Sequence, residues 1–129
     1  MKIGAYQFAV TGSIEQNMSA IRRAITLAAK ESIRLLVFPE CALTGYPKHD
    51  ERSSNVDFQT LETCFTELRK LSSQNSMYLL VGSVTKDGDL YHNSAVLIPP
   101  GGSEETRYYK RALWGWDISN FSEGSPGGI

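Results

Sequence analysis

Apolar residues follow two different periods in the first part of the chain. Residues 3–10 alternate between apolar and small or polar side chains, which predicts a strand. From residue 14 onward apolar side chains recur every three or four positions and form one helical stripe: Ile14, Met18, Ile21, Ile25 and Ala28. Ser13 and Gln16 have the spacing of a capping box at the start of that helix. Residues 34–38 are a nearly continuous apolar run, which favours a strand buried on both faces.

The rest of the chain continues with a second helix and then with strands. After a polar stretch that is typical of a long loop, Asp57 can cap a helix whose apolar stripe comprises Phe58, Leu61, Phe65, Leu68 and Leu71. Residues 77–84 and 90–98 predict two strands with a tight turn at 86–89, and residues 107–111 predict another. The order β-α-β-α-β-β-β predicts an α/β fold with helices packed on one face of a sheet.

Composition and charge exclude several classes of protein. The chain has 129 residues, and its 13 Lys and Arg against 14 Asp and Glu give a net charge of −1. A nearly neutral chain without a basic run lacks the electrostatic footprint of a nucleic-acid-binding protein. No apolar run approaches the ~20 residues that span a membrane. The first residues lack a signal-peptide pattern, and two cysteines suit a reducing compartment. We therefore expect a soluble, cytoplasmic protein with no nucleic-acid or membrane partner.

Two charged residues follow predicted strands, where α/β sheets present functional groups. Glu40 comes directly after Pro39 and the apolar run, and a carboxylate beside apolar surroundings can act as a general base. Lys110 lies near the end of the last predicted strand, where an ammonium could stabilise an oxyanion. Position alone also fits a simpler interpretation, in which Glu40 is a solvated strand end and Lys110 a surface lysine.

Short motifs along the chain occur in one characteristic order. They are Phe-Pro-Glu at 38–40, Leu-Thr-Gly-Tyr at 43–46, Tyr-His-Asn-Ser-Ala at 91–95, Tyr-Lys at 109–110 and the segment 116–121 followed by Gly124. Each motif is short, but in this order and spacing they resemble the nitrilase, or carbon-nitrogen hydrolase, superfamily. The resemblance covers essentially all 129 residues.

The resemblance implies part of an α-β-β-α sandwich that hydrolyses non-peptide C–N bonds in amides or nitriles, without a metal or an organic cofactor. The family's catalytic set is a Glu, a Lys and a Cys, and Glu40 matches its general base while Lys110 matches its oxyanion-stabilising lysine. Asp117 is the nearest match to a second carboxylate that helps to position substrate, although its spacing is loose and the family residue is usually Glu. Tyr46 could line the substrate pocket or pack on its own loop.

The family's nucleophilic cysteine lies on a later strand, several tens of residues beyond the lysine, and the sequence ends before it. Cys41 directly follows Glu40, so in an extended backbone their side chains would point to opposite sides. Cys41 could still react if the chain turned sharply at this point. Cys64 falls on the apolar stripe of the second helix, as a small core residue would. We therefore expect residues 1–129 to be the N-terminal portion of a single hydrolase domain, truncated before the nucleophile and inactive alone.

The expected partners follow from this incomplete sandwich. A sheet without its opposing layer favours association with a complementing C-terminal portion or with further copies in a homo-oligomer. The small-molecule partner would be an amide or nitrile, and Trp114 and Trp116 suggest a partly apolar pocket. Two other functions stay open. One is a non-catalytic protein that binds a small amide or a partner subunit, and the other is a metal protein that uses His49, Asp50 and His92, although their spacing is poor for ligands.

Overall fold

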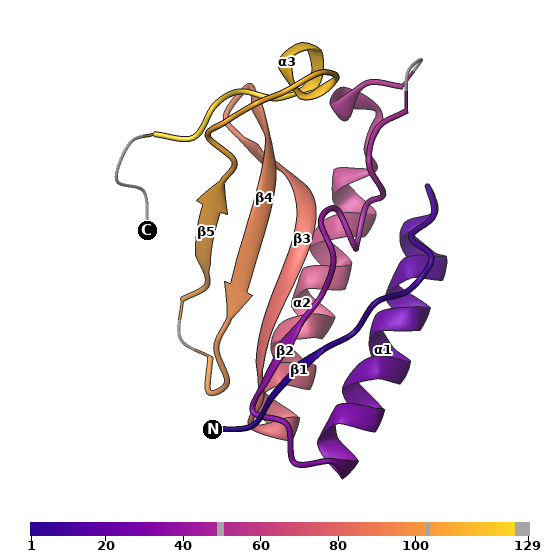
Figure 1. Cartoon of the computed structure of the whole chain (residues 1–129), viewed down its shortest axis with the longest axis vertical. Coiled ribbons are helices and arrows are strands. Elements are labelled where there is room, and N and C mark those ends of the chain that lie inside the picture. Colours follow the sequence, from indigo (N-terminus) through magenta and orange to yellow (C-terminus); the bar gives the residue numbers. More distant parts are fainter. Residues whose placement is uncertain (49–50, 103, 126–129) are drawn as a thin grey trace.

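Five strands form one sheet whose spatial order follows the chain, β1-β2-β3-β4-β5 (Figure 1). The computed structural model describes residues 1–48, 51–102 and 104–125. The strands are β1 (Ile3–Ala5), β2 (Leu35–Val37), β3 (Tyr78–Asp87), β4 (Leu90–Ile98) and β5 (Thr106–Tyr109). The first three strands are parallel, and the last three are antiparallel. This arrangement confirms the predicted order of strands and helices.

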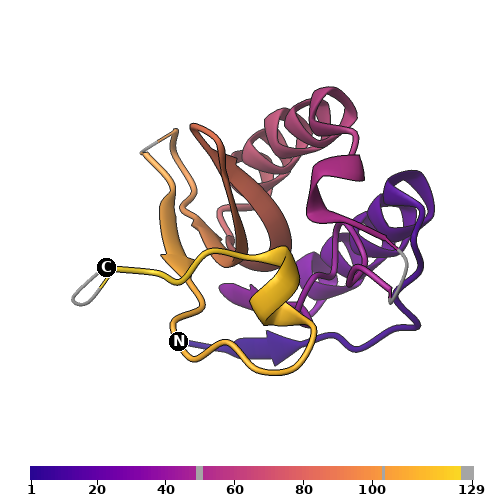
Figure 2. The same cartoon turned by 90° about the horizontal axis from the view of Figure 1, so that it is seen from above.

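Both long helices lie on the same face of the sheet (Figure 2). They are α1 (Ile14–Lys30), between β1 and β2, and α2 (Phe58–Asn75), between β2 and β3. Ser13 and Asp57 cap them, as predicted, because their side-chain oxygens accept amide N–H groups of the first turn. Two short helices lie in connecting segments: η1 (Ser53–Asn55) and α3 (Asp117–Asn120).

The predicted helical stripes form the hydrophobic core against the sheet. Met18 and Ile21 of α1 and Leu68 of α2 have no exposed surface. They belong to one buried cluster with strand residues, among them Leu36, Leu79, Val81, Val96 and Ile98. Cys64 is buried in the same cluster, as its position on the apolar stripe predicts.

The first strand is shorter than the alternation over residues 3–10 predicts. Its pairing with β2 ends with a hydrogen bond of 3.0 Å from the amide of Tyr6 to the carbonyl of Val37. Val37 is the last residue of β2, and Pro39 then turns the chain away. The alternation continues after Tyr6, but no neighbouring strand remains for the backbone to pair with.

The face of the sheet opposite the helices carries apolar side chains from all five strands. Residues directly opposite in the ladder share a face, which places on it Ile3, Leu35, Val37, Tyr78, Leu80, Leu97 and Tyr108. We call this surface the open face. All seven side chains are exposed or half-buried. The prediction that the strand over residues 34–38 is buried on both faces is therefore wrong for the described residues, because they provide no second layer of strands over β2.

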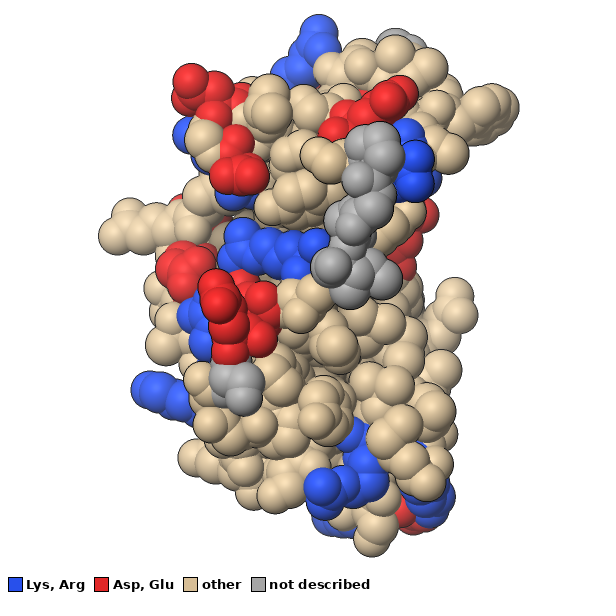
Figure 3. Space-filling model, turned by 90° about the vertical axis from the view of Figure 1, so that its left-hand side faces the viewer, with Lys and Arg blue, Asp and Glu red and all other residues tan. Residues whose placement is uncertain are grey.

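Charged residues of both signs lie on the side of the molecule that carries β5 (Figure 3). Glu105, just before β5, pairs with Arg107 and also with Arg69 of α2, at 3.1 Å. Charges along an exposed edge strand oppose its pairing with a strand of another molecule. Among the described residues, no helix is long and apolar enough to span a membrane.

Candidate active site

Glu40 and Lys110 meet in space although 70 positions separate them in the chain. Glu40 lies in the turn that follows β2, and Lys110 directly follows β5. The Nζ atom of Lys110 is 3.2 Å from Oε1 of Glu40. The structure thus brings together the two residues that the sequence analysis selected as base and oxyanion-stabilising cation.

The turn that carries Glu40 is hydrogen-bonded to β3, the strand next to β2 on the side away from β1. The amide of Leu43 donates to the carbonyl of Gly82 at 3.0 Å. The amide of Val84 in turn donates to Oγ1 of Thr44, also at 3.0 Å. The turn therefore continues the pairing of β2 with β3, and these bonds fix the backbone that carries Glu40 to the middle of the sheet.

Gly82 allows this close approach, and we expect Gly82→Ala to displace the turn. A Cβ at residue 82 would lie 2.2 Å from the carbonyl oxygen of Pro39 and 2.6 Å from the amide nitrogen of Cys41. Since both contacts are with backbone, the change should lower the free energy of unfolding by about 1–3 kcal/mol. Gly12→Ala is a matched control, because a Cβ there would meet nothing within 4 Å. Denaturant unfolding measures both variants, and equal stabilities would contradict the prediction.

Asn17 fixes the same turn from the side of α1. Its buried Nδ2 donates to the carbonyls of Leu43 at 3.1 Å and Thr11 at 2.7 Å, while its Oδ1 accepts the amide of Thr11 at 2.9 Å. Gly45 completes the contact, since its φ of 77° and a Cβ position 2.5 Å from the Thr11 carbonyl oxygen leave room only for glycine. Bonds from α1 and from β3 therefore hold the turn on both sides.

Lys110 is held by its backbone and by its charge. Its amide donates to the carbonyl of Asn93 at 2.8 Å, and its carbonyl accepts the amide of Gly124 at 3.1 Å. Besides Glu40, its Nζ contacts Oδ2 of Asp117 at 2.8 Å. The hydrogen bond to Asp117, with further help from Glu40, outweighs the effect of partial burial and raises the pKa of Lys110. The side chain is therefore a cation near neutral pH.

Asp117, at the start of α3, is the buried partner of Lys110. Its side chain is 2% exposed. Its Oδ1 accepts the phenolic hydrogen of Tyr46 at 2.5 Å, and its Oδ2 accepts the amide of Trp114 at 3.3 Å. Burial alone would raise the pKa of Asp117, but the bonds from Lys110, Tyr46 and Trp114 hold it below its usual value. The carboxylate is therefore ionised and faces the lysine.

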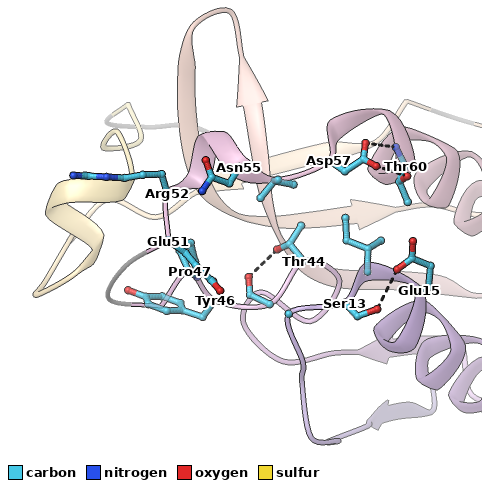
Figure 4. A pocket seen from close by; sticks show the side chains of 14 residues that line it. Ser13, Glu15, Thr44, Tyr46, Pro47, Glu51, Arg52, Asn55, Asp57 and Thr60 are labelled. Carbon is cyan, nitrogen blue, oxygen red and sulfur yellow. Dashed lines mark hydrogen bonds between the residues drawn. The ribbon is translucent and has the colours of Figure 1, made fainter.

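Tyr46 bonds to Asp117 of this cluster and also lines a cavity of about 450 Å³ (Figure 4). Burial and the bond to Asp117 raise the pKa of its phenol, so the hydroxyl stays a donor. The cavity opens between the starts of α1 and α2, and its charged lining residues are Glu15, Glu51, Arg52 and Asp57. Neither Glu40 nor Lys110 lines it. Trp114 and Trp116 are exposed and lie outside its lining.

Cys41 is buried although the chain turns sharply at this residue. Its φ of 49° is left-handed, so the backbone here is not extended, and the expectation that the Glu40 and Cys41 side chains point to opposite sides no longer applies. The thiol nevertheless points inward and donates to Oδ1 of Asn93, with 3.7 Å between sulfur and oxygen. Burial, with smaller effects of Glu40 and Asp117, raises the pKa of Cys41 to about 12. The residue next to the candidate base is thus a protonated, inaccessible thiol.

We expect both cysteines to resist alkylation in the native protein at pH 8. The thiolate is the reactive form, and with a pKa of about 12 for Cys41 roughly one thiol in 10⁴ is ionised at that pH. Burial also raises the pKa of Cys64. Iodoacetamide treatment followed by peptide mass spectrometry should show modification only after denaturation. Rapid modification of native Cys41 would contradict this structure of the turn.

The metal interpretation gains no support from the described parts of the chain. They hold no group of three or more His, Cys, Asp or Glu residues arranged to bind a metal ion. His92 stacks on Tyr109, with ring centroids 4.0 Å apart, and its Nδ1 pairs with the carbonyl of Ser122 at 2.9 Å. His49 and Asp50 lie outside the described residues.

Comparison with known proteins identifies the family. The family model for carbon-nitrogen hydrolases matches residues 2–127. The chain belongs to the carbon-nitrogen hydrolase family. Its sequence is similar to that of a nitrilase from Pyrococcus abyssi, with 30% identity over 100 residues that cover 68% of this chain and 34% of the nitrilase. The predicted family is therefore confirmed.

Solved structures of other proteins have the same fold as this chain. The NitN amidase from Nesterenkonia sp. AN1 matches with a TM-score of 0.83 and 21% identity over 97% of this chain and 50% of the amidase. A variant of that amidase carries the acetamide moiety of fluoroacetamide on its active-site cysteine. It matches with a TM-score of 0.82 and 20% identity over 97% of this chain and 48% of the variant. These matches confirm the predicted fold class. The chain spans about a third of the nitrilase and half of the amidase.

Asn93 belongs to the cluster around Glu40, although the sequence did not mark it as a site residue. Its Nδ2 donates to Oε1 of Glu40 at 2.6 Å. The available signals were its place in the Tyr-His-Asn-Ser-Ala motif at 91–95 and its alternate position with Ala95 and Leu97 along the strand. That pattern predicts which face the side chain occupies, but not that the turn after β2 ends beside it.

Proposed function

We propose that this chain supplies the general base and the oxyanion-stabilising ammonium of a hydrolase that acts on a small amide or nitrile. The observation that carries the proposal is the 3.2 Å contact between Lys110 and Glu40 in a chain of the carbon-nitrogen hydrolase family. A carboxylate can move the proton while a neighbouring cation stabilises the charge that develops on oxygen. The proposed chemistry needs neither a metal nor an organic cofactor.

In the proposed reaction with an amide, a cysteine thiol transfers its proton to Glu40 as its sulfur attacks the carbonyl carbon. The C–S bond forms while the C=O π electrons move onto oxygen, and the ammonium of Lys110 stabilises the resulting negative charge. The C=O bond then re-forms as the C–N bond breaks, and Glu40 gives its proton to the departing amine. Water finally cleaves the thioester, with Glu40 taking the proton of water and returning it to the sulfur.

We propose that the thiol comes from polypeptide beyond these residues. Cys41 and Cys64 are buried, and their pKa values are raised. The chain covers 34% of the related nitrilase and 50% of the NitN amidase, whose variant carries its adduct on a cysteine. A complementing C-terminal portion would bring both the thiol and a second layer over the open face. Homo-oligomer contacts are the other proposed partner arrangement.

Asp117 and Tyr46 are proposed to serve the substrate side of the site. The 2.8 Å contact of Asp117 with Lys110 and the phenol of Tyr46 on the other carboxylate oxygen support this role. Through these bonds the pair would aim the ammonium at the carbonyl oxygen of the substrate. The ring of Tyr46 also lines the adjoining cavity, so it could contact the rest of the substrate.

Ammonia release from small amides and nitriles tests the proposal. We expect the whole protein to hydrolyse at least one compound of the size of acetamide, propionamide or propionitrile. Residues 1–129 alone should show no turnover above a Glu40→Gln control. Turnover by residues 1–129 that Glu40→Gln abolishes would contradict the external thiol. No turnover by the whole protein would contradict the hydrolase function.

A non-catalytic protein that binds a small amide is the second candidate. Burial of both cysteines of the sequence favours it, because no thiol of these residues is available for attack. Calorimetric titration with the same amides separates the two functions. Saturable binding without turnover by the whole protein would support the second candidate.

A further inference from the structure

Asn93 is the one residue whose bonds reach Glu40, Lys110 and Cys41 within the described cluster. It lies on β4 and is 5% exposed. Its Nδ2 donates to Oε1 of Glu40 at 2.6 Å, and its Oδ1 accepts the thiol hydrogen of Cys41 across 3.7 Å. Its backbone carbonyl accepts the amide of Lys110 at 2.8 Å. Both ends of the side-chain amide are therefore used, and each has one defined partner.

These bonds treat the two oxygens of Glu40 differently. The bond from Asn93 and the contact with Lys110 both end on Oε1. A carboxylate oxygen that already accepts two donors is less able to take a proton than its neighbour. The Oε2 atom carries neither of these bonds, so it is the better base of the two. The same two bonds fix the carboxylate plane and hence the direction in which Oε2 faces.

The thiol of Cys41 determines which end of the Asn93 amide faces Glu40. The two ends of an amide have nearly the same shape, and only their partners distinguish them. With Oδ1 held by the thiol, the NH₂ group must face the carboxylate. Rotation of the amide by 180° would instead set Oδ1 against Oε1 of Glu40, two acceptors without a hydrogen between them. A buried, protonated Cys41 therefore has a use that needs no reactivity.

We propose that Asn93 is a positioning residue that directs Oε2 of Glu40 toward the reacting proton, and that the Cys41 thiol keeps the Asn93 amide in the required orientation. This inference rests on the proposed function, in which Glu40 is the general base. It assigns a role to two residues that take no direct part in bond making. Asn93 acts through Glu40, and Cys41 acts through Asn93.

Kinetics of Cys41 and Asn93 variants test the inference in the whole protein. Misplacement of a reacting group by about 1 Å can cost ~10²-fold in rate, so Asn93→Leu should lower kcat by about that factor with KM changed less than threefold. Cys41→Ala should lower kcat about tenfold, and Cys41→Ser should recover most of that loss because a hydroxyl can also donate to Oδ1. Cys64→Ala, at the other buried cysteine, is the control for removal of a thiol from the core.

The Ala and Ser variants separate a positioning role from a structural one. Alanine suits a buried, apolar site better than serine, so a merely structural Cys41 would make Cys41→Ala the more stable variant and at least as active. The proposal expects the reverse order in kcat, whatever the order of stability from thermal unfolding. Equal kcat values for the two variants would overturn it, and so would a larger kcat for Cys41→Ala.

A spectroscopic measurement distinguishes this inference from the hydrolase proposal, since it needs no turnover. In protein labelled with ¹⁵N-asparagine, the two Nδ2 protons of Asn93 should be well separated in chemical shift, because one of them is bonded to a carboxylate. Glu40→Gln should reduce that separation, and Cys41→Ala should broaden or shift the pair more than Cys41→Ser. If the Asn93 signals changed neither in Glu40→Gln nor in Cys41→Ala, the inference would be overturned even if the protein hydrolyses amides. Signals that respond as expected in a protein without turnover would support the Asn93 orientation and contradict the hydrolase function.

Discussion

Lys110→Met is expected to lower kcat of the whole protein about 10²- to 10³-fold, the usual effect of removing one oxyanion donor. Methionine keeps much of the length of the lysine side chain but carries no charge. Because the ammonium acts mainly on charge that develops during the reaction, KM should change much less than kcat. Steady-state kinetics with the best amide substrate measure both constants.

The same substitution should also affect stability, because Asp117 would lose its cation. The Asp117 side chain is 2% exposed and Lys110 is 36% exposed. Removing one partner of a buried polar group costs about 1–3 kcal/mol in the free energy of unfolding. The double variant Lys110→Met/Asp117→Asn should recover part of that stability, since the buried charge is gone, but none of the activity. Recovery of activity together with stability would show that Lys110 acts through folding alone.

Lys2→Met is the matched control for Lys110. Lys2 is also a partly exposed lysine in an ion pair, with Glu31 at 3.4 Å, but it lies just before the start of β1, whereas Glu40 follows the end of the neighbouring parallel strand β2. Its substitution should leave kcat within experimental error. A loss of kcat in Lys2→Met comparable to that in Lys110→Met would point to a general effect of charge.

Glu40→Gln is expected to lower kcat about 10²- to 10⁴-fold, the range for loss of a general base. The glutamine carbonyl can still accept bonds from Asn93 and Lys110, so the turn should keep its geometry. Glu40 is 55% exposed, and the free energy of unfolding should change by no more than about 0.5 kcal/mol. Steady-state kinetics and denaturant unfolding of the same preparation measure the two effects.

Glu62→Gln is the control for removal of a carboxylate. Glu62 is 61% exposed and pairs with Arg69 at 3.0 Å, so its setting resembles that of Glu40 apart from the site. We expect no change in kcat. A Glu40→Gln protein that retains more than a fifth of the wild-type kcat would contradict the role of Glu40 as base.

Sequence patterns predicted the parts of the fold that depend on residues within a single helix or strand. The stripes of α1 and α2 and the caps at Ser13 and Asp57 were predictable because periodicity and capping are local. The length of β1 was not, because a strand ends where its neighbour ends, and β2 ends at Val37, just before Pro39 turns the chain away. The position of Glu40 and Lys110 at strand ends was visible, but their 3.2 Å contact depends on the register of the strands between them.

The remainder of the site depends on backbone geometry that composition does not reveal. The left-handed φ of Cys41 turns its thiol toward Asn93 instead of away from Glu40. The phenol of Tyr46 reaches Asp117 across 71 positions of sequence. Neither contact follows from spacing, because each joins a loop residue to a side chain on a distant element.

The attachment of the Glu40 turn to β3 has a consequence for folding. The bond from the amide of Leu43 to the carbonyl of Gly82 can form only after β3 has paired in parallel with β2. This pairing closes the long connection that contains α2, and closing a long loop has an entropic cost. Lys110 needs the following hairpin of β3 and β4 as well as β5. The Glu40–Lys110 contact should therefore appear among the last events of folding. A spectroscopic label near this contact would report completion of the sheet, whereas labels within α1 would report only local order.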